Sequence, residues 1–248
     1  MWDGTTYLFE GEYVLLCEGL ADKAFFRELA RRQRLPNFDF PWPPAPEDKA
    51  PEAAKKLFGK EAFGKMLAAL DGLFDLFPER LTQIKAILIA ADTAEDGAST
   101  FGRIRNQILK IPNFGIPTAI GQPAASQHGR PPVGVLLVPG DGRPGGLETL
   151  CVDAFREKHS QVCRCMEDYL RCHPIDLSDW TPESQDKARL QCLIAATNRD
   201  DPNKTLRWAF SSSSGSPIID IAAHSFDAVA QALTNFCEAT GARPMTTA

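Results

Sequence analysis

Residues 13–29 read Tyr13-Val14-Leu15-Leu16-Cys17-Glu18-Gly19-Leu20-Ala21-Asp22-Lys23-Ala24-Phe25-Phe26-Arg27-Glu28-Leu29. The first half is an apolar run that favours a β-strand, and helical spacing of apolar residues begins shortly after Gly19. Glu18 therefore lies at a predicted strand-to-helix turn, where open α/β sheets leave a crevice that collects ligands. Asp22, one helical turn further on, adds a second carboxylate. Alternatively, Glu18 caps the following helix, and the charge of Asp22 interacts favourably with the positive N-terminal end of that helix.

Two further apolar runs end in acidic residues in the same way. Residues 84–91 predict a buried strand that leads into Asp92 and Asp96, followed by a helix from about Ser99 to Leu109 with Ser99 as its cap. Residues 133–138 predict a third strand, and after a glycine-rich turn Glu148 lies in the first turn of a helix over 147–155. Each of the three predicted strands is thus followed by one or more carboxylate side chains.

This recurrence predicts a site for a hard cation. Strands that alternate with helices form parallel sheets, so their carboxyl ends meet at one edge. Carboxylates brought together there repel one another strongly unless a divalent ion neutralises them. Oxygen ligands of this kind suit hard cations.

The composition is that of a globular protein able to bury a sizeable core, with 248 residues of which 44% are hydrophobic. The net charge of -5 gives no general attraction to nucleic acid or anionic membranes, so a polyanion needs a local basic groove or bound cations. No apolar span of bilayer length and no signal peptide is recognised, so we expect no membrane association and a cytoplasmic location.

The seven cysteines favour free thiols rather than disulfides. One tight group could bind zinc, although its spacing differs from that of ordinary structural zinc sites. The alternative is a helix face that carries plain thiols. This group comprises Cys163, Cys165, Cys172 and His173.

The rest of the chain divides by composition. The first helix should run to about Arg34, and residues 36–46 contain five prolines, which predict an extended connection. Helical spacing returns over 59–77. We therefore expect a single domain over 1–248, with a proline-rich and helical insertion at 36–80 and a mainly helical C-terminal extension at 156–248.

Residues 17–26 resemble the glutamate motif of Toprim domains, which topoisomerases, DnaG-type primases and OLD-family nucleases share. Ala90-Ala91-Asp92 stands where the Toprim Asp-x-Asp motif is expected. More narrowly, residues 136–141 followed by Gly145-Gly146-Leu147-Glu148 are similar to DUF3226, a small Toprim-like group of uncharacterised proteins. The order of motifs in the tail is similar too, so the resemblance covers about residues 13–236.

The resemblance implies a Toprim-like, mainly parallel sheet flanked by helices, and a nuclease or related phosphotransfer activity on nucleic acid that depends on Mg²⁺ or Mn²⁺. It implies Glu18 as general acid/base. The metal ligands would come from Glu18, Asp22, Asp92, Asp96 and Glu148. Phosphate would be held by Lys23, Arg103 and Arg143, whose alternative role is a solvated helix surface.

One departure from the Toprim pattern concerns the second strand. The first aspartate of the Asp-x-Asp pair is Ala90 here, so one metal ligand is lost. This favours an alternative function, a catalytically degenerate Toprim-like binding or regulatory module that works with a protein partner.

Overall fold

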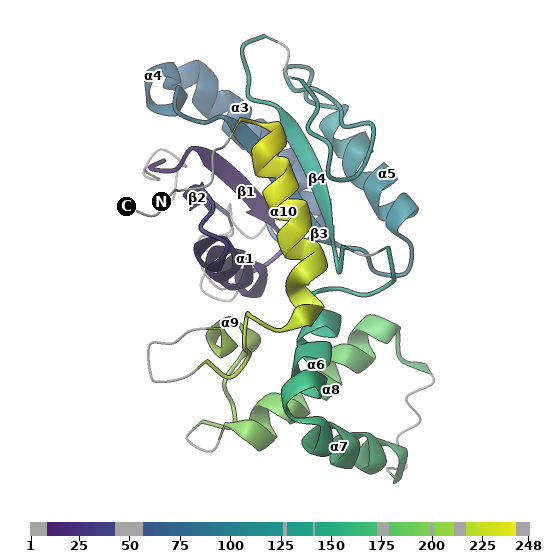
Figure 1. Ribbon diagram of the computed structural model, residues 1–248. Helices are drawn as coiled ribbons and strands as arrows, with labels where there is room; N and C mark the ends of the chain where they lie inside the picture. Colours follow the sequence, from purple (N-terminus) through teal and green to yellow (C-terminus); the bar gives the residue numbers. More distant parts are fainter. Residues whose placement is uncertain are drawn as a thin grey trace.

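The structure is a computed structural model that describes residues 9–42, 57–125, 128–140, 142–172, 179–198, 201–210 and 217–241. Figure 1 shows a twisted sheet with helices on both faces and a group of helices beyond one end of the strands. Residues 43–56 of the predicted insertion lie outside the described residues.

Four parallel strands form one sheet in the order β2-β1-β3-β4. They are β1 (Tyr13–Cys17), β2 (Phe38–Asp39), β3 (Ala86–Asp92) and β4 (Val133–Val138). The mixed α/β class with a parallel sheet flanked by helices is confirmed. The short edge strand β2 was not predicted, because its two residues lie in a proline-rich segment that gives no strand pattern.

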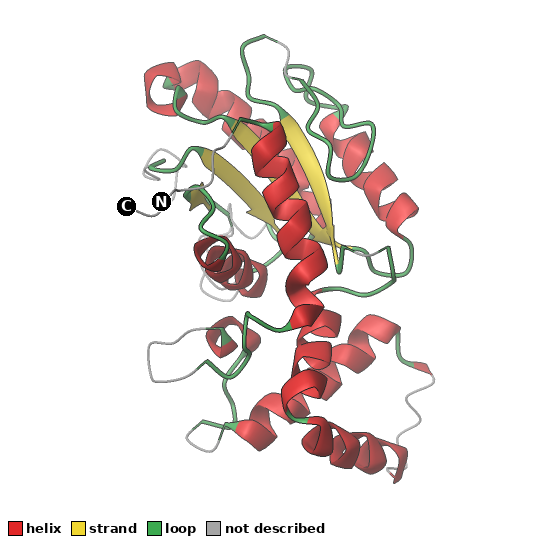
Figure 2. Cartoon of the chain, viewed as in Figure 1, coloured by secondary structure: helices red, strands yellow, loops and turns green. Residues whose placement is uncertain are grey.

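Helices fill the connections between the strands (Figure 2). On the sheet lie α1 (Leu20–Arg32), the 3-10 turn η2 (Lys60–Ala62), α3 (Phe63–Leu76), α4 (Pro78–Leu81), α5 (Gly97–Ile108) and α10 (Asp227–Ala239). The helices after β4 are α6 (Leu147–Lys158), α7 (Ser160–Cys172), α8 (Pro182–Thr197) and α9 (Leu206–Ala209), and η4 (His224–Phe226) precedes α10. None of the described helices is both long and apolar enough to cross a bilayer.

The core has two layers because the pleat of each strand sends alternate side chains to opposite faces. One face packs against α1, α6 and α10 and contains Tyr13, Leu15, Cys17, Leu88, Ala90, Leu136 and Val138. The other packs against α3 and α5 and contains Val14, Leu16, Ile87, Ile89, Ala91, Val135 and Leu137. Burial on both faces explains why these strands read as continuous apolar runs.

Helix α10 crosses the sheet after the chain has left it for the helical group (Figure 1). Its Phe236 ring lies directly over Gly134 in β4, where an added Cβ would come within 2.4 Å of the ring. At the end of the helix, the Thr240 hydroxyl donates to the Tyr13 hydroxyl at 3.3 Å. Helix α10 therefore covers the face of the sheet that includes β4 and the start of β1.

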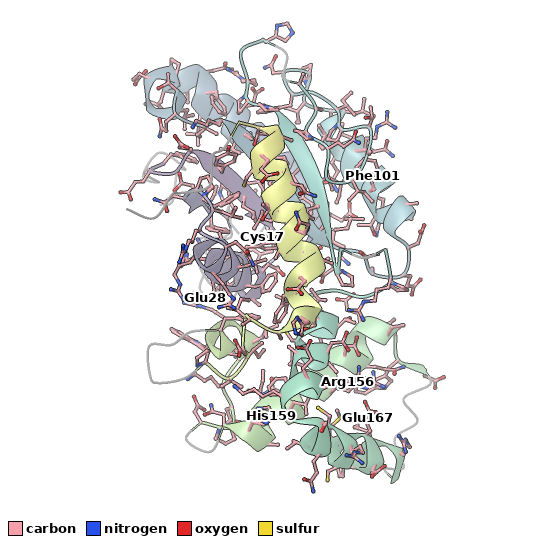
Figure 3. The ribbon with its side chains drawn as sticks, in the orientation of Figure 1. Cys17, Glu28, Phe101, Arg156, His159 and Glu167 are labelled. Carbon is pink, nitrogen blue, oxygen red and sulfur yellow. The ribbon has the colours of Figure 1, made fainter. Side chains whose placement is uncertain are left out.

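The helices α6, α7 and α8 are joined by ion pairs as well as by apolar contacts. Arg156 on α6 and Arg189 on α8 both pair with Glu167 on α7, at 3.3 and 3.4 Å. Figure 3 labels Arg156 and Glu167, which face each other between their helices. This network fixes the helical group that follows β4.

Several predicted element boundaries and one cap differ from the structure. The first helix ends at Arg32, and Arg34 takes a left-handed conformation with φ 54° that a helix does not continue. The second strand begins at Ala86, two residues later than predicted. Asp96, not Ser99, caps α5, because its carboxylate accepts hydrogen bonds from the Ala98 and Ser99 amides.

Candidate functional site

The carboxyl ends of β1 and β3 bring two predicted site residues together. Cys17, labelled in Figure 3, is the last residue of β1 and pairs with Ala90 in β3. Glu18 follows it, and its Oε1 accepts a hydrogen bond from the backbone amide of Asp92 at 3.0 Å. The side chain of Glu18 thus reaches across to the end of the neighbouring strand.

The start of α6 is attached to the same edge. The amide of Leu147 donates to Asp92 Oδ1 at 3.0 Å, so the carboxylate of Asp92 lies against the first turn of α6. Glu148 is the next residue of that turn. The backbone comes this close because residue 146 is glycine: an added Cβ would lie 2.4 to 2.7 Å from the carboxylate atoms of Asp92.

We expect the Gly146→Ala variant to displace the Asp92 carboxylate and to lower the free energy of unfolding by about 1 to 3 kcal/mol, because the new methyl group overlaps it. Urea unfolding in EDTA measures the change. Gly19→Ala is the matched control, since Gly19 also precedes a helix in an extended conformation but its Cβ would lie 3.5 Å from the nearest Asp22 oxygen. Equal losses in the two variants would contradict the close contact with Asp92.

Asp22 lies in the first turn of α1 and accepts a hydrogen bond from the Gly19 amide at 2.8 Å. It therefore caps its own helix, whereas the structural alternative gave the cap to Glu18, which bonds to β3 instead. Burial and the nearby charges of Glu18 and Glu148 raise the pKa of Asp22 to about 7. Asp22 is thus a helix cap and also a member of the group of carboxylates at this edge.

Glu18, Asp22, Asp92 and Glu148, which we call the acidic cluster, all have raised pKa values. Burial, together with the charge of Asp92, raises the pKa of Glu18 to about 8. Burial and the charges of Asp22 and Glu148 raise the pKa of Asp92 well above its usual value. Burial also raises the pKa of Glu148. The four side chains are half-buried, so water screens their repulsion poorly.

Two lysines near the acidic cluster were not among the predicted site residues. The Gly59 amide donates to the Glu18 carbonyl at 3.1 Å, which places the following Lys60 where its charge lowers the pKa values of Glu18 and Asp92. Lys187 on α8 lowers the pKa of Glu148. Lys187 itself is held by Glu183 at 2.6 Å. In the sequence, Lys187 could have been noticed because Glu183 precedes it by four residues, the spacing of an ion pair on a helix. No comparable pattern marks Lys60.

The remaining predicted residues lie elsewhere. Asp96 is exposed, caps α5 and does not belong to the acidic cluster. With Arg103 it lines a cavity of about 420 Å³ that Lys60 and Glu183 also border. Lys23 Nζ donates to the Phe40 carbonyl at 2.5 Å, and Arg143 pairs with Asp153 on α6 at 2.7 Å.

The cysteines give no metal centre in the described part of the chain. Cys163 is buried and Cys165 is exposed on α7, so the two thiols point in different directions. His173 and the side chain of Cys172 lie outside the described residues. Among the side chains that the structure describes, no three of His, Cys, Asp or Glu converge on a point that a metal ion could occupy. Any ion at the acidic cluster would therefore have fewer than three such ligands in this arrangement.

Fold and site together define an α/β protein whose parallel sheet carries four interacting carboxylates where its strands end. The sequence model of one family, DUF3226, described as a protein of unknown function, matches residues 12–238. The chain belongs to this family, which confirms the resemblance to DUF3226. No curated protein and no solved structure gives a significant match.

Proposed function

We propose that this protein is a Toprim-like enzyme that uses Mg²⁺ or Mn²⁺ to hydrolyse phosphodiester bonds of nucleic acid. The observation that carries the proposal is the acidic cluster, in which burial raises the pKa values of four carboxylates from three strand-to-helix junctions and the charges of neighbouring members raise those of Glu18, Asp22 and Asp92 further. Such crowding is costly unless protons or a cation offset it. A divalent ion would offset it at neutral pH.

The donor set suits a hydrated Mg²⁺ better than an ion enclosed by protein. Glu18 and Asp92 each use one carboxylate oxygen for a backbone amide, which leaves the second oxygen for a cation or its water. Mg²⁺ commonly takes one or two carboxylates and keeps several waters. This agrees with the lack of a converging group of three ligands in the described residues. The ion would lower the pKa of an attacking water and offset the charge of the phosphate.

The protein's own groups suit acid–base chemistry near neutral pH. Glu18, with a pKa of about 8, can exchange a proton close to the working pH, which is the condition for an efficient general acid or base. Lys60 and Lys187 place positive charge beside the carboxylates. That charge would help a phosphate group to approach an otherwise acidic edge.

One observation favours the second function, a Toprim-like binding or regulatory module without turnover that acts with a protein partner. The side chain of Ala90 is 2% exposed and lies on the same face of the sheet as Cys17 and Leu136. The position that the Asp-x-Asp motif would give to a carboxylate therefore holds a methyl group in the core. Metal binding without cleavage would support this second function.

The test is the melting temperature of the protein in EDTA and in millimolar Mg²⁺ or Mn²⁺. We expect the metal to raise Tm by about 4 to 8 °C, because only the folded state assembles the acidic cluster. Glu18→Gln should abolish the shift while keeping an oxygen that accepts the Asp92 amide. Glu238→Gln is the matched control, since Glu238 is exposed near the C-terminal end of α10, at the opposite edge of the sheet.

Cleavage is then measured with supercoiled plasmid, linear duplex and single strands. We expect Glu18→Gln to lower the rate by at least about 100-fold, the usual contribution of a general acid or base. A Tm that does not respond to metal, together with intact substrates, would refute the proposed enzymatic function. A metal response with intact substrates would support the regulatory module.

A further inference from the structure

Three arginines lie along and just beyond α1, at a spacing of four and three residues. Arg27, Arg31 and Arg34 are exposed and line a cavity of about 390 Å³. Arg27 and Arg31, four residues apart on α1, share a helix face and lie about 6 Å apart along it, and Arg34 follows two residues after the helix ends. Figure 3 labels Glu28, which lies on the outer side of α1. The cavity also borders Phe38 and Phe40 at the edge strand β2.

The positive charge of this cavity is only partly compensated. Arg31 Nε donates to Glu28 at 3.0 Å. Within the described ranges, the guanidinium groups of Arg27 and Arg34 pair with no carboxylate. Arg27 lies instead over the ring of Phe40, 5.5 Å from its centroid. Two acids also border the cavity, the exposed Glu10 and the buried Asp39, whose carboxylate accepts the Gly11 amide at 2.7 Å.

The positive charge continues onto α9, which packs against α1 (Figure 1). Arg207 lies over the ring of Trp208, 4.8 Å from its centroid, and 46% of Trp208 is exposed. The charges of both helices act on Lys23, because burial together with the charges of Arg27 and Arg207 lowers its pKa to about 8. We call Arg27, Arg31, Arg34, Arg207 and Trp208 the α1–α9 basic surface.

We propose that the α1–α9 basic surface binds a single strand of nucleic acid through the phosphate backbone of that strand. Guanidinium groups bind phosphate with charge-assisted, bidentate hydrogen bonds. An exposed tryptophan and stacked guanidinium groups offer flat faces to unpaired bases, which a duplex does not present. A local groove of this kind is also what a protein with a net charge of -5 needs to hold a polyanion.

The direction of α1 connects this surface with the acidic cluster. Asp22 is in the first turn of α1, and Arg27 lies about 7 Å further along the same helix axis. A strand on the basic surface would thus extend toward the carboxyl ends of β1 and β3. This last step rests on the proposed function, whereas binding to the surface does not.

The test is fluorescence anisotropy of a labelled single strand of about 20 nucleotides, titrated in EDTA over a range of salt. We expect the Arg27→Ala/Arg207→Ala double variant to bind about 30-fold more weakly. The slope of log affinity against log salt should fall by about 1.4, since each lost phosphate contact on a single strand changes it by about 0.7. Trp208→Ala should weaken binding by about 5-fold or more without changing that slope.

The matched control is Arg105→Ala/Lys110→Ala, which removes the same charge from exposed positions at α5, on the other side of the sheet. Equal weakening by the two double variants would mean that only total charge matters and would overturn the proposal. So would a free mononucleotide that displaces the strand at equal concentration, or the lack of binding by the wild type at low salt. Glu18→Gln should bind like the wild type, so this test and the metal test can fail separately.

Discussion

We expect Gly134→Val to lower the free energy of unfolding by about 3 kcal/mol, because the new side chain would overlap the Phe236 ring. Even its Cβ would lie 2.4 Å from Cε2 and 2.9 Å from Cδ2 of that ring. Phe236 is completely buried between α10 and the sheet, so the ring cannot turn away without displacing its neighbours. Valine favours strands by less than about 1 kcal/mol, which does not offset the overlap. Urea unfolding measures the difference.

Two further variants show whether the loss comes from this contact. Gly102→Ala in α5 is the control, because an added Cβ meets no atom within 4 Å there, and it should stabilise the protein by about 0.5 to 1 kcal/mol. Adding Phe236→Leu to Gly134→Val should recover at least about 1 kcal/mol in a double-mutant cycle. A Gly134→Val variant as stable as the wild type would contradict the position of α10.

The free energy of unfolding in EDTA should fall by about 2 to 4 kcal/mol between about pH 5 and about pH 8. The pKa of Glu18 is about 8 and that of Asp22 about 7 in the folded protein, well above the usual carboxyl values. Between the usual and the raised pKa, the folded state binds more protons than the unfolded state. Stability is therefore complete below the usual values and is lost as the pH rises through the raised ones.

The Glu18→Gln variant separates this effect from ordinary titration. It removes one of the crowded charges, so it should be more stable than the wild type at about pH 8 by about 1 kcal/mol and should depend less on pH. Glu238→Gln should titrate like the wild type. Millimolar Mg²⁺ should flatten the wild-type profile if the ion replaces the protons. A wild-type stability in EDTA that rises with pH over this range would contradict the crowding of the four carboxylates.

The parallel sheet could be predicted because each long strand is buried on both faces and is therefore apolar throughout. The place of Glu18, Asp92 and Glu148 followed from that, since parallel strands end at one edge. The metal-ligand role of Asp96 remains a prediction, although the structure shows Asp96 as an exposed cap of α5. A cap and a ligand look alike in sequence, because both are acids at the start of a helix.

Other parts of the site could not be placed from the sequence. Lys60 comes near the acidic cluster because the Gly59 amide bonds to the Glu18 carbonyl, a contact over 41 residues that no local pattern announces. Lys187 approaches through α8, whose position depends on the ion pairs among α6, α7 and α8. The close contact between the start of α6 and the Asp92 carboxylate depends on Gly146, and the sequence around Gly146 indicates only an ordinary turn.

The position of α10 determines when one face of the sheet becomes covered during synthesis. The first strand is synthesised more than 200 residues before α10, which is the last helix among the described residues. During translation, this face of the sheet therefore lacks its contacts with α10 while the helical group is made. A nascent chain would therefore expose part of an apolar sheet until residues 227–239 have left the ribosome, and exposed apolar surface of this kind promotes aggregation.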